Sequence, residues 1–321
     1  MPDSGIGIWG IPLAIGAGAV RVSTPFVFVS LGECITEKSG RINLGLEGIL
    51  VMGAMVAYGI SGQAAHFIPG TAGTYIAPWL GVLAAGAVGS LLGLLHALLC
   101  QRPRVNDIAV GIALMLFGVG LAFYLGKPLI SAAAPRLPDL SLGFWSSNEI
   151  IRFNLNVNLL FVLGCILAPI LAWGFKSTRW GMVVRTVGES ADSARAMGYS
   201  VNHVRMLATM AGGFLAGVGG SFLSLAYPGS WNEGLSSGQG LIAVALVIFA
   251  RWNPVKCLWA SLLFGGAGAI APALQAQGIT SGKYLYGAAP YILTLLIMIL
   301  TCSTKKTFAG APAELGAASF A

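Results

Sequence analysis

Two carboxylates and one amide stand inside otherwise apolar sequence, where ionisable side chains are costly. Glu47 lies within "INLGLEGILVMG", and Asn106 and Asp107 directly precede "IAVGIALMLF". Such groups can relay protons or line a transport pathway. Structural roles are the alternative: Glu47 can pair with Arg41 or cap a broken helix. Asn106 and Asp107 can instead cap the helix that follows them. The residue types alone leave both interpretations open.

Polar residues also gather at two interruptions of hydrophobic sequence, one in each half of the chain. The first, "ECITEKSGRINLGLEG", breaks around residues 39–40, and the second, "YPGSWNEGLSSGQGLIAVAL", breaks around residues 236–240. Backbone groups freed by a helix break are tolerated at membrane depth only beside protein or a water-lined cavity. Broken helices at related places in two halves therefore point to a transport pathway. The polar and aromatic side chains at these breaks are Asn43, Glu47, Trp231, Asn232 and Gln239.

Patterns typical of enzymes and cofactor sites are incomplete. Gly234, Ser236 and Gly238 match G-x-S-x-G, but a nucleophile elbow also needs a strand-to-helix turn and a partner base. Residues 278–283 fall one residue short of a phosphate-binding loop, so we expect the chain itself to bind no ATP and no other cofactor. The five cysteines are far apart, and we interpret them as small apolar residues rather than metal ligands. An intramembrane enzyme would lack a paired nucleophile and base.

The elements that must position these residues are membrane helices. The chain of 321 residues is 56% hydrophobic and 9% charged, whereas a soluble domain has about 25% charged residues, so a water-soluble enzyme is excluded. Apolar runs long enough to cross about 30 Å of hydrocarbon predict an all-α polytopic membrane protein. About nine membrane segments, two of them broken, are predicted at 12–36, 44–63, 77–100, 107–126, 157–175, 206–227, 239–250, 256–275 and 287–303.

Glycine accounts for 45 residues of the chain. Gly89 and Gly93 stand four residues apart in one apolar segment, as do Gly213 and Gly217 in another. This spacing lets two helix backbones approach closely. We infer helix packing from these pairs and nothing further.

Basic residues are distributed unevenly between the loops, which sets the predicted orientation. With the C-terminus in the cytoplasm, most of the 18 Lys and Arg residues fall on the cytoplasmic side. These are Lys38, Arg41, Arg102, Arg104, Lys176, Arg179, Arg185, Arg195, Arg205, Arg251, Lys256, Lys305 and Lys306. We therefore expect the N-terminus outside and the C-terminus inside. The net charge of +7 then reflects topology and indicates no nucleic-acid partner.

The most charged stretch is the predicted cytoplasmic loop 176–205, which contains "TRWGMVVRTVGESADSARAMGYSVNHVR". Ser190 can cap a helix N-terminus, and Asp192 falls in the first turn of that helix. Gly198 can adopt the left-handed backbone conformation that ends a helix. The pattern predicts a two-turn helix held between two membrane spans. A solvated connector is the alternative.

Four stretches together resemble a known family: "GECITEKSGRINLGLEGILVMGAMVA", "VNDIAVGIALMLF", the charged loop above, and "GQGLIAVALVIFARWNPVKCLWASLLFG". They are similar to the membrane permeases of ABC importers, in the branched-chain amino acid and ribose permease family, and most similar to its simple-sugar and nucleoside branch. The resemblance runs from about Arg21 to about Leu300. It implies a transmembrane permease domain at 1–303, with a coupling loop at 176–205. Residues 304–321 are expected to form a cytoplasmic C-terminal tail without family signal.

The resemblance implies a non-enzymatic subunit in the bacterial cytoplasmic (inner) membrane. Its expected partners are a cytoplasmic ABC ATPase that binds ATP, a second permease of a different sequence, and a periplasmic or lipoprotein substrate-binding protein. The family contacts its ATPase through a short coupling helix with a pattern like E-A-A-x-x-x-G. Here "DSARAMG" occupies that place, with Asp192 for Glu and Ser193 for the first Ala. The expected coupling residues are Glu189, Asp192, Ser193, Ala194 and Gly198.

The substrates that the resemblance implies, nucleosides or simple sugars, are neutral and rich in hydroxyl groups. Their pathway should offer amide, hydroxyl and aromatic groups rather than a cluster of one charge. The candidate pathway residues are Asn43, Glu47, Asn106, Asp107, Trp231, Asn232 and Gln239. The competing hypothesis is a proton-coupled secondary transporter that uses Glu47 and Asp107 as its relay, and it predicts transport by the purified chain alone.

Overall fold

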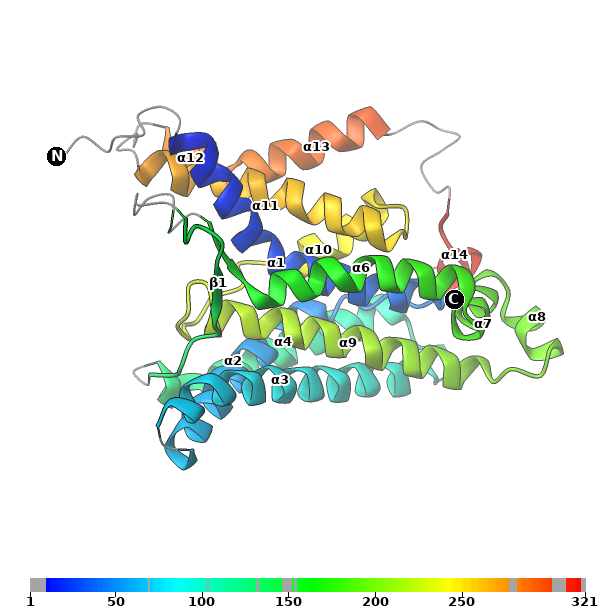
Figure 1. Cartoon of the computed structure of the whole chain (residues 1–321). Coiled ribbons are helices and arrows are strands. Elements are labelled where there is room, and N and C mark those ends of the chain that lie inside the picture. The colour runs from blue at the N-terminus through cyan, green and yellow to red at the C-terminus, as the bar shows by residue number, and fades with distance from the viewer. Residues whose placement is uncertain are drawn as a thin grey trace.

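Seven long apolar helices dominate the chain. The computed structural model describes residues 10–68, 70–102, 104–130, 133–145, 152, 155–276, 282–301 and 310–318. Within these ranges the helices long enough to cross a membrane lie roughly parallel to one another (Figure 1). They are α1 (Gly10–Lys38), α2 (Leu46–Phe67), α3 (Thr71–Cys100), α4 (Asp107–Gly126), α6 (Leu159–Ser177), α9 (Val201–Leu225) and α11 (Pro254–Ala276).

These helices confirm seven of the predicted membrane segments, but not the count of nine. The predicted segments 239–250 and 287–303 correspond to α10 (Gln239–Phe249) and α13 (Ala289–Thr301), which have 11 and 13 residues. An α-helix rises 1.5 Å per residue, so α10 extends over about 16 Å, about half of a 30 Å hydrocarbon layer. α10 is therefore long enough to cross only about half of the hydrocarbon layer.

The first predicted interruption is a corner between two helices rather than a break within one. α1 continues through Pro25 and ends at Lys38. The Ser39 hydroxyl then donates to the Thr36 carbonyl oxygen at 2.7 Å, and Gly40 adopts a left-handed φ of +83°. α2 begins six residues later, at Leu46. We call residues 39–45 the α1–α2 corner.

Close backbone contact joins the central helices. α9 packs against α1, α2 and α3. A Cβ atom added to Gly93 of α3 would lie 2.6 Å from the carbonyl oxygen of Thr209 on α9, and Gly89 and Gly213 face one another's backbone in the same way. The predicted packing role of these glycines is confirmed, because no larger side chain fits between the two backbones.

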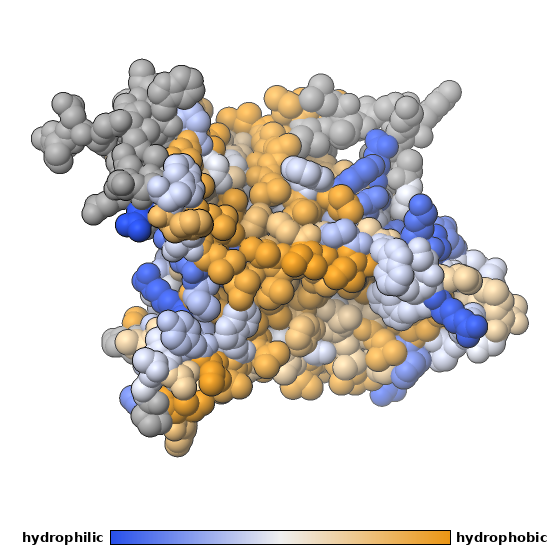
Figure 2. Space-filling model, viewed as in Figure 1, coloured by the Kyte–Doolittle hydropathy of each residue, from blue (hydrophilic) through white to orange (hydrophobic). Residues whose placement is uncertain are grey.

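A hydrophobic belt surrounds the bundle. Figure 2 shows hydrophobic side chains across the middle of the molecule and hydrophilic ones toward its two ends. The outer helices expose large apolar side chains, including Leu91, Leu116, Trp173 and Trp259. Such a surface would be unfavourable in water and matches the solvent properties of lipid chains.

The two ends of the bundle carry different small elements. At one end lie α7 (Arg179–Glu189), α8 (Ala191–Ala196) and α14 (Ala313–Ala318) (Figure 1). The other end carries η2 (Lys127–Leu129), α12 (Lys283–Gly287) and an antiparallel ribbon of β1 (Asp139–Ser141) and β2 (Asn156–Asn158). We call these the α8 end and the ribbon end. The ribbon is a small exception to the all-α expectation.

Candidate functional site

Glu47 caps the N-terminus of the half-length helix α10. Its Oε1 accepts hydrogen bonds from the Ser236 hydroxyl at 2.5 Å and from the Gly238 N–H at 3.1 Å. Its Oε2 accepts one from the Gly240 N–H at 2.6 Å. The carboxylate thus satisfies amide groups that a helix start leaves unpaired and complements the helix dipole. Of the sequence alternatives for Glu47, the cap on a broken helix is the arrangement observed.

The segment before α10 returns from the ribbon end into the bundle. Trp231 is 2% exposed, and its indole N–H donates to the Gly126 carbonyl oxygen at 2.9 Å, at the last residue of α4. Its ring also packs against Phe123, with centroids 6.5 Å apart. Beyond α10, the indole N–H of Trp252 donates to a carboxylate oxygen of Glu37, near the end of α1. Contacts with the first half of the chain therefore fix α10 on both sides.

Asn43 lies fully buried in the α1–α2 corner. Its backbone N–H donates to Glu33 Oε1 at 2.8 Å, and its side-chain oxygen accepts from the Gly45 N–H at 3.0 Å. Among the described residues, its side-chain nitrogen has no hydrogen-bond partner. Asn43 therefore shapes the turn before α2, and one of its donor groups remains available in a buried position.

Asn106 and Asp107 lie at the start of α4, at the α8 end of the bundle. The Asn106 side-chain oxygen caps the helix by accepting from the backbone N–H groups of Ile108 at 2.8 Å and Ala109 at 3.2 Å. Asp107 is 3% exposed and forms a salt bridge with Arg41 from the α1–α2 corner. The structure thus pairs Arg41 with Asp107 rather than with Glu47, and it shows the capping alternative for Asn106.

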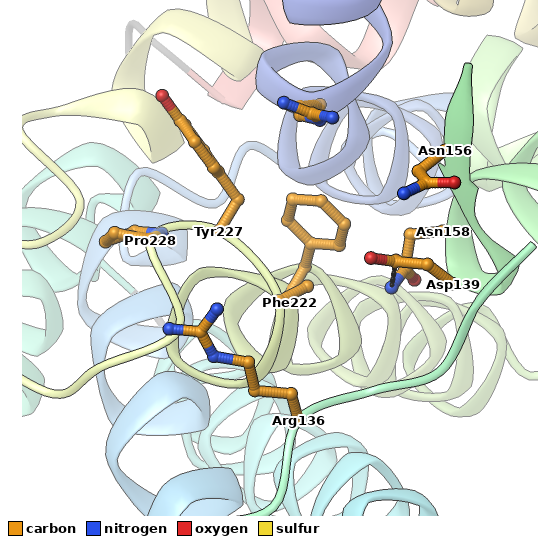
Figure 3. Close-up of a pocket in the computed structure, with 9 residues that line it drawn as sticks. Arg136, Asp139, Asn156, Asn158, Phe222, Tyr227 and Pro228 are labelled. Atoms are coloured by element: carbon orange, nitrogen blue, oxygen red, sulfur yellow. Dashed lines mark hydrogen bonds between the residues drawn. The ribbon is translucent and has the colours of Figure 1, made fainter. Parts of the chain in front are cut away.

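A polar cavity of about 260 Å³ opens at the ribbon end. Figure 3 shows Asp139, Asn156 and Asn158 on one side, Tyr227 and Pro228 on the other, and the Phe222 ring between them. The Asn158 amide donates to Asp139 at 3.0 Å and thereby ties the two strands together. Arg21 and Arg136 complete the charged lining.

A second cavity, of about 220 Å³, shares Arg21, Tyr227 and Pro228 with the first and reaches Gln239 at the start of α10. The side-chain oxygen of Gln239 is buried and has no hydrogen-bond partner among the described residues. Asn232 is exposed in the segment before α10. Usual ligand pockets measure about 300–1,000 Å³. Each cavity is somewhat smaller than this range.

The charged loop forms two short helices at the α8 end. The Ser190 hydroxyl oxygen caps α8 by accepting from the Ser193 N–H at 3.2 Å, and Gly198 ends the turn with a φ of +84°. The predicted short helix with this cap and this stop is confirmed. Ala194 is fully buried in a small apolar cluster with Val187, Ala191 and Val201.

The outward side of this loop is polar and accessible. Glu189, Asp192, Ser193 and Gly198 are exposed, and Asp192 pairs with Arg195 at 2.7 Å. A short helix with one buried face and one exposed face can move as a unit when another protein contacts it. Of the predicted coupling residues, only Ala194 faces inward.

Several residues of these sites were not predicted from the sequence. Arg136, Asp139 and Tyr227 line the first cavity at the ribbon end, and Glu33 and Glu37 are buried acids in α1. Glu33 and Glu37 stand four residues apart, which places both on one face of a helix. That spacing was a usable signal for the acids, whereas no local pattern marks the cavity residues.

The fold defines a polytopic membrane protein with seven long apolar helices among its described residues, a short exposed helix at one end and polar cavities at the other. Comparison with known proteins identifies the family. A family model described as the permease component of the branched-chain amino acid transport system matches residues 16–302. The chain belongs to this family. Its relatives are transport components and not enzymes.

Three relatives illustrate the similarity. The chain is 31% identical over 299 residues to the nucleoside ABC transporter permease protein NupC of Lactococcus lactis, covering 89% of this chain and 91% of the relative. It is 30% identical over 297 residues to the guanosine ABC transporter permease protein NupQ of Bacillus subtilis, covering 86% and 88%. It is 31% identical over 252 residues to the putative glucose ABC transporter permease protein TsgC13 of Haloferax volcanii, covering 77% and 73%.

Proposed function

We propose that this chain is the permease subunit of an ATP-driven importer and forms half of the translocation pathway for nucleosides or chemically similar neutral polar solutes. The observation that carries the proposal is the similarity over nearly the whole chain to permeases named for nucleosides and guanosine. Transport energy comes from ATP bound by a partner ATPase, so the chain needs no cofactor of its own.

The exposed face of α8 is the proposed docking point for that ATPase. Glu189, Asp192 and Ser193 present polar groups to it, while buried Ala194 anchors the helix to the bundle. Gly198 ends the turn in the left-handed region, which glycine adopts without strain. Closure of the ATPase dimer would push α8 as a lever and switch the pathway from outward-facing to inward-facing.

The α8 end is the proposed cytoplasmic side of the bacterial inner membrane. Basic residues near the membrane favour that side, and the α8 end carries Lys38, Lys176, Arg185 and Arg195 among others. The ribbon end then faces outward, where a periplasmic or lipoprotein binding protein would deliver the solute.

The solute pathway is proposed to run from the ribbon-end cavities toward the start of α10, with a second permease of different sequence supplying the facing wall. The small volume of each cavity supports a pathway whose wall is shared between two permeases. Gln239 and exposed Asn232 offer amide groups to hydroxyl-rich ligands. Trp231 holds the segment in place from its buried position. Asn43 and Asn106 lie nearer the α8 end and would act later in the passage.

Proton-coupled transport is not favoured. The Glu47 carboxylate already accepts hydrogen bonds from Ser236, Gly238 and Gly240, and Asp107 is paired with Arg41. Both carboxylates are therefore held by fixed contacts within the chain, whereas a relay needs partners that deliver and remove a proton.

Substitution of Gly198, which ends the turn after α8, tests the proposed function. The chain is reconstituted in liposomes with the ATPase and second permease from its gene neighbourhood and with the matching binding protein, and uptake of labelled guanosine, uridine and ribose is measured. Gly198→Pro removes the N–H that donates to the Arg195 carbonyl oxygen at 2.9 Å and forbids the positive φ. It should abolish ATP-dependent uptake while the chain still inserts.

The matched control is Gly70→Pro, because Gly70 is also exposed with a positive φ but lies at the ribbon end, before α3. It should retain most uptake. Normal uptake in Gly198→Pro would contradict the coupling role of α8. Uptake by the chain without its ATPase would contradict the importer assignment itself.

A further inference from the structure

The described part of the C-terminal tail is packed against the α8 end of the bundle. Leu315 of α14 is 8% exposed and belongs to the same apolar cluster as Val184 of α7 and Ala208 of α9. A Cβ atom added to Gly40 would lie 2.8 Å from the Cβ of Glu314. α14 thus touches the α1–α2 corner, and Figure 1 shows it beside α7.

One side chain of α14 joins two other elements, and one of these connects it to a third. Glu314 Oε1 accepts from the backbone N–H of Ala191, the first residue of α8, at 2.9 Å. Its Oε2 accepts from Arg205 Nη2 of α9 at 3.0 Å. Arg205 Nε in turn donates to the Ser39 carbonyl oxygen in the α1–α2 corner at 3.1 Å. Three consecutive hydrogen bonds therefore run from α8 to the corner.

This connection is sheltered from solvent. The side chains of Glu314 and Arg205 are 24% and 13% exposed, so their ion pair is screened less than a surface pair. Each Glu314 oxygen accepts a hydrogen bond from within the chain. Its position suits transmission of movement inside the subunit.

The corner at the far end of the connection leads to the proposed pathway. Arg41 of the corner holds Asp107 at the start of α4. Glu47, directly after the corner, caps α10. A displacement of α8 that reaches Ser39 would therefore act on the two elements that border the pathway from the α8 end.

We propose that Glu314 is a positioning residue that couples movement of α8 to the α1–α2 corner. The C-terminal tail is then required for efficient transport. The inference rests on the proposed function. Without Glu314, α8 would remain attached through its chain connections and the apolar cluster around Ala194, and it could move without carrying the corner along.

The experiment measures nucleoside transported per ATP hydrolysed in the reconstituted complex described above. Glu314→Gln removes the charge of the ion pair while keeping nearly the same shape. Arg205→Lys keeps the positive charge but cannot bridge Glu314 and Ser39 together. The control is Glu233→Gln, the same chemical change at an exposed glutamate beyond the ribbon end of α9. ATPase co-purification and thermal unfolding are measured for every variant.

We expect Glu314→Gln and Arg205→Lys to lower the transport-to-ATP ratio about tenfold, the factor that corresponds to about 1.4 kcal/mol, while the ATPase remains bound. Glu233→Gln should keep the wild-type ratio. An unchanged ratio in Glu314→Gln would overturn the inference, as would loss of the ATPase, which would assign the tail to docking. Failure of the wild-type complex to transport would instead refute the proposed function, and the inference with it.

Discussion

Replacement of Glu47 by glutamine separates its capping role from a role in proton transfer. The glutamate accepts three hydrogen bonds from the start of α10, at 2.5, 3.1 and 2.6 Å. Glutamine has nearly the same shape but only one acceptor oxygen, and its NH₂ group would face N–H donors. At least one amide at the start of α10 would therefore lose its acceptor in a buried position.

The cost follows from these contacts. A hydrogen bond to a charged group contributes about 1.5–3 kcal/mol, and a carboxylate at a helix N-terminus adds about 0.3–1 kcal/mol. Glu47→Gln should therefore lower the free energy of unfolding by about 2–4 kcal/mol. At about 2 °C for each kcal/mol, the midpoint of thermal unfolding should fall by about 4–8 °C.

The assay is thermal unfolding of the purified chain in detergent, with Glu233→Gln as the control because that glutamate is exposed. The control should unfold at the wild-type temperature. A Glu47→Gln chain as stable as the wild type would refute the capping argument. If that stable variant also abolished uptake driven by a proton gradient, the relay hypothesis would have to be restored.

Two further predictions concern buried contacts within the bundle. Gly93→Ala places a methyl group 2.6 Å from the Thr209 carbonyl oxygen, so overpacking should lower stability by about 1–3 kcal/mol. Gly120→Ala, with open space around it, should not lower stability in the same thermal assay, because alanine favours a helix over glycine. Trp231→Phe removes the indole N–H bonded to Gly126 and should cost about 1–3 kcal/mol, seen as faster proteolysis of the segment before α10. Equal stability of the two alanine variants, or unchanged proteolysis, would contradict these arguments.

Features governed by local sequence were predicted well. Long apolar runs determine the seven spans, because a backbone in lipid must satisfy its hydrogen bonds within the helix. Ser190 and Gly198 mark the ends of α8 and its turn through side-chain capping and a left-handed backbone, both of which act within a few residues. The spacing of Gly89 and Gly93 likewise indicated a close helix contact.

Features that depend on distant contacts were not predictable. Glu314 meets Ala191 across 123 positions, and Glu47 meets Gly240 across 193 positions. Nothing near Glu314 in sequence distinguishes it from an ordinary charge in an alanine-rich tail. For Glu47, the sequence included the cap that the structure shows among its structural alternatives, but gave no means of choosing it over the pair with Arg41, because the choice depends on which helix start lies opposite.

The half-length of α10 has a consequence for how the protein is made. A helix of eleven residues is too short to be inserted into a bilayer as an independent span, and its leading amides need the Glu47 carboxylate. Residues 226–250 must therefore reach their final position after α2 is already in place, by folding inside the membrane. Synthesis of the second half alone should leave residues 226–250 outside the bundle at the ribbon end, and α11, which follows them, would then insert in the reverse direction.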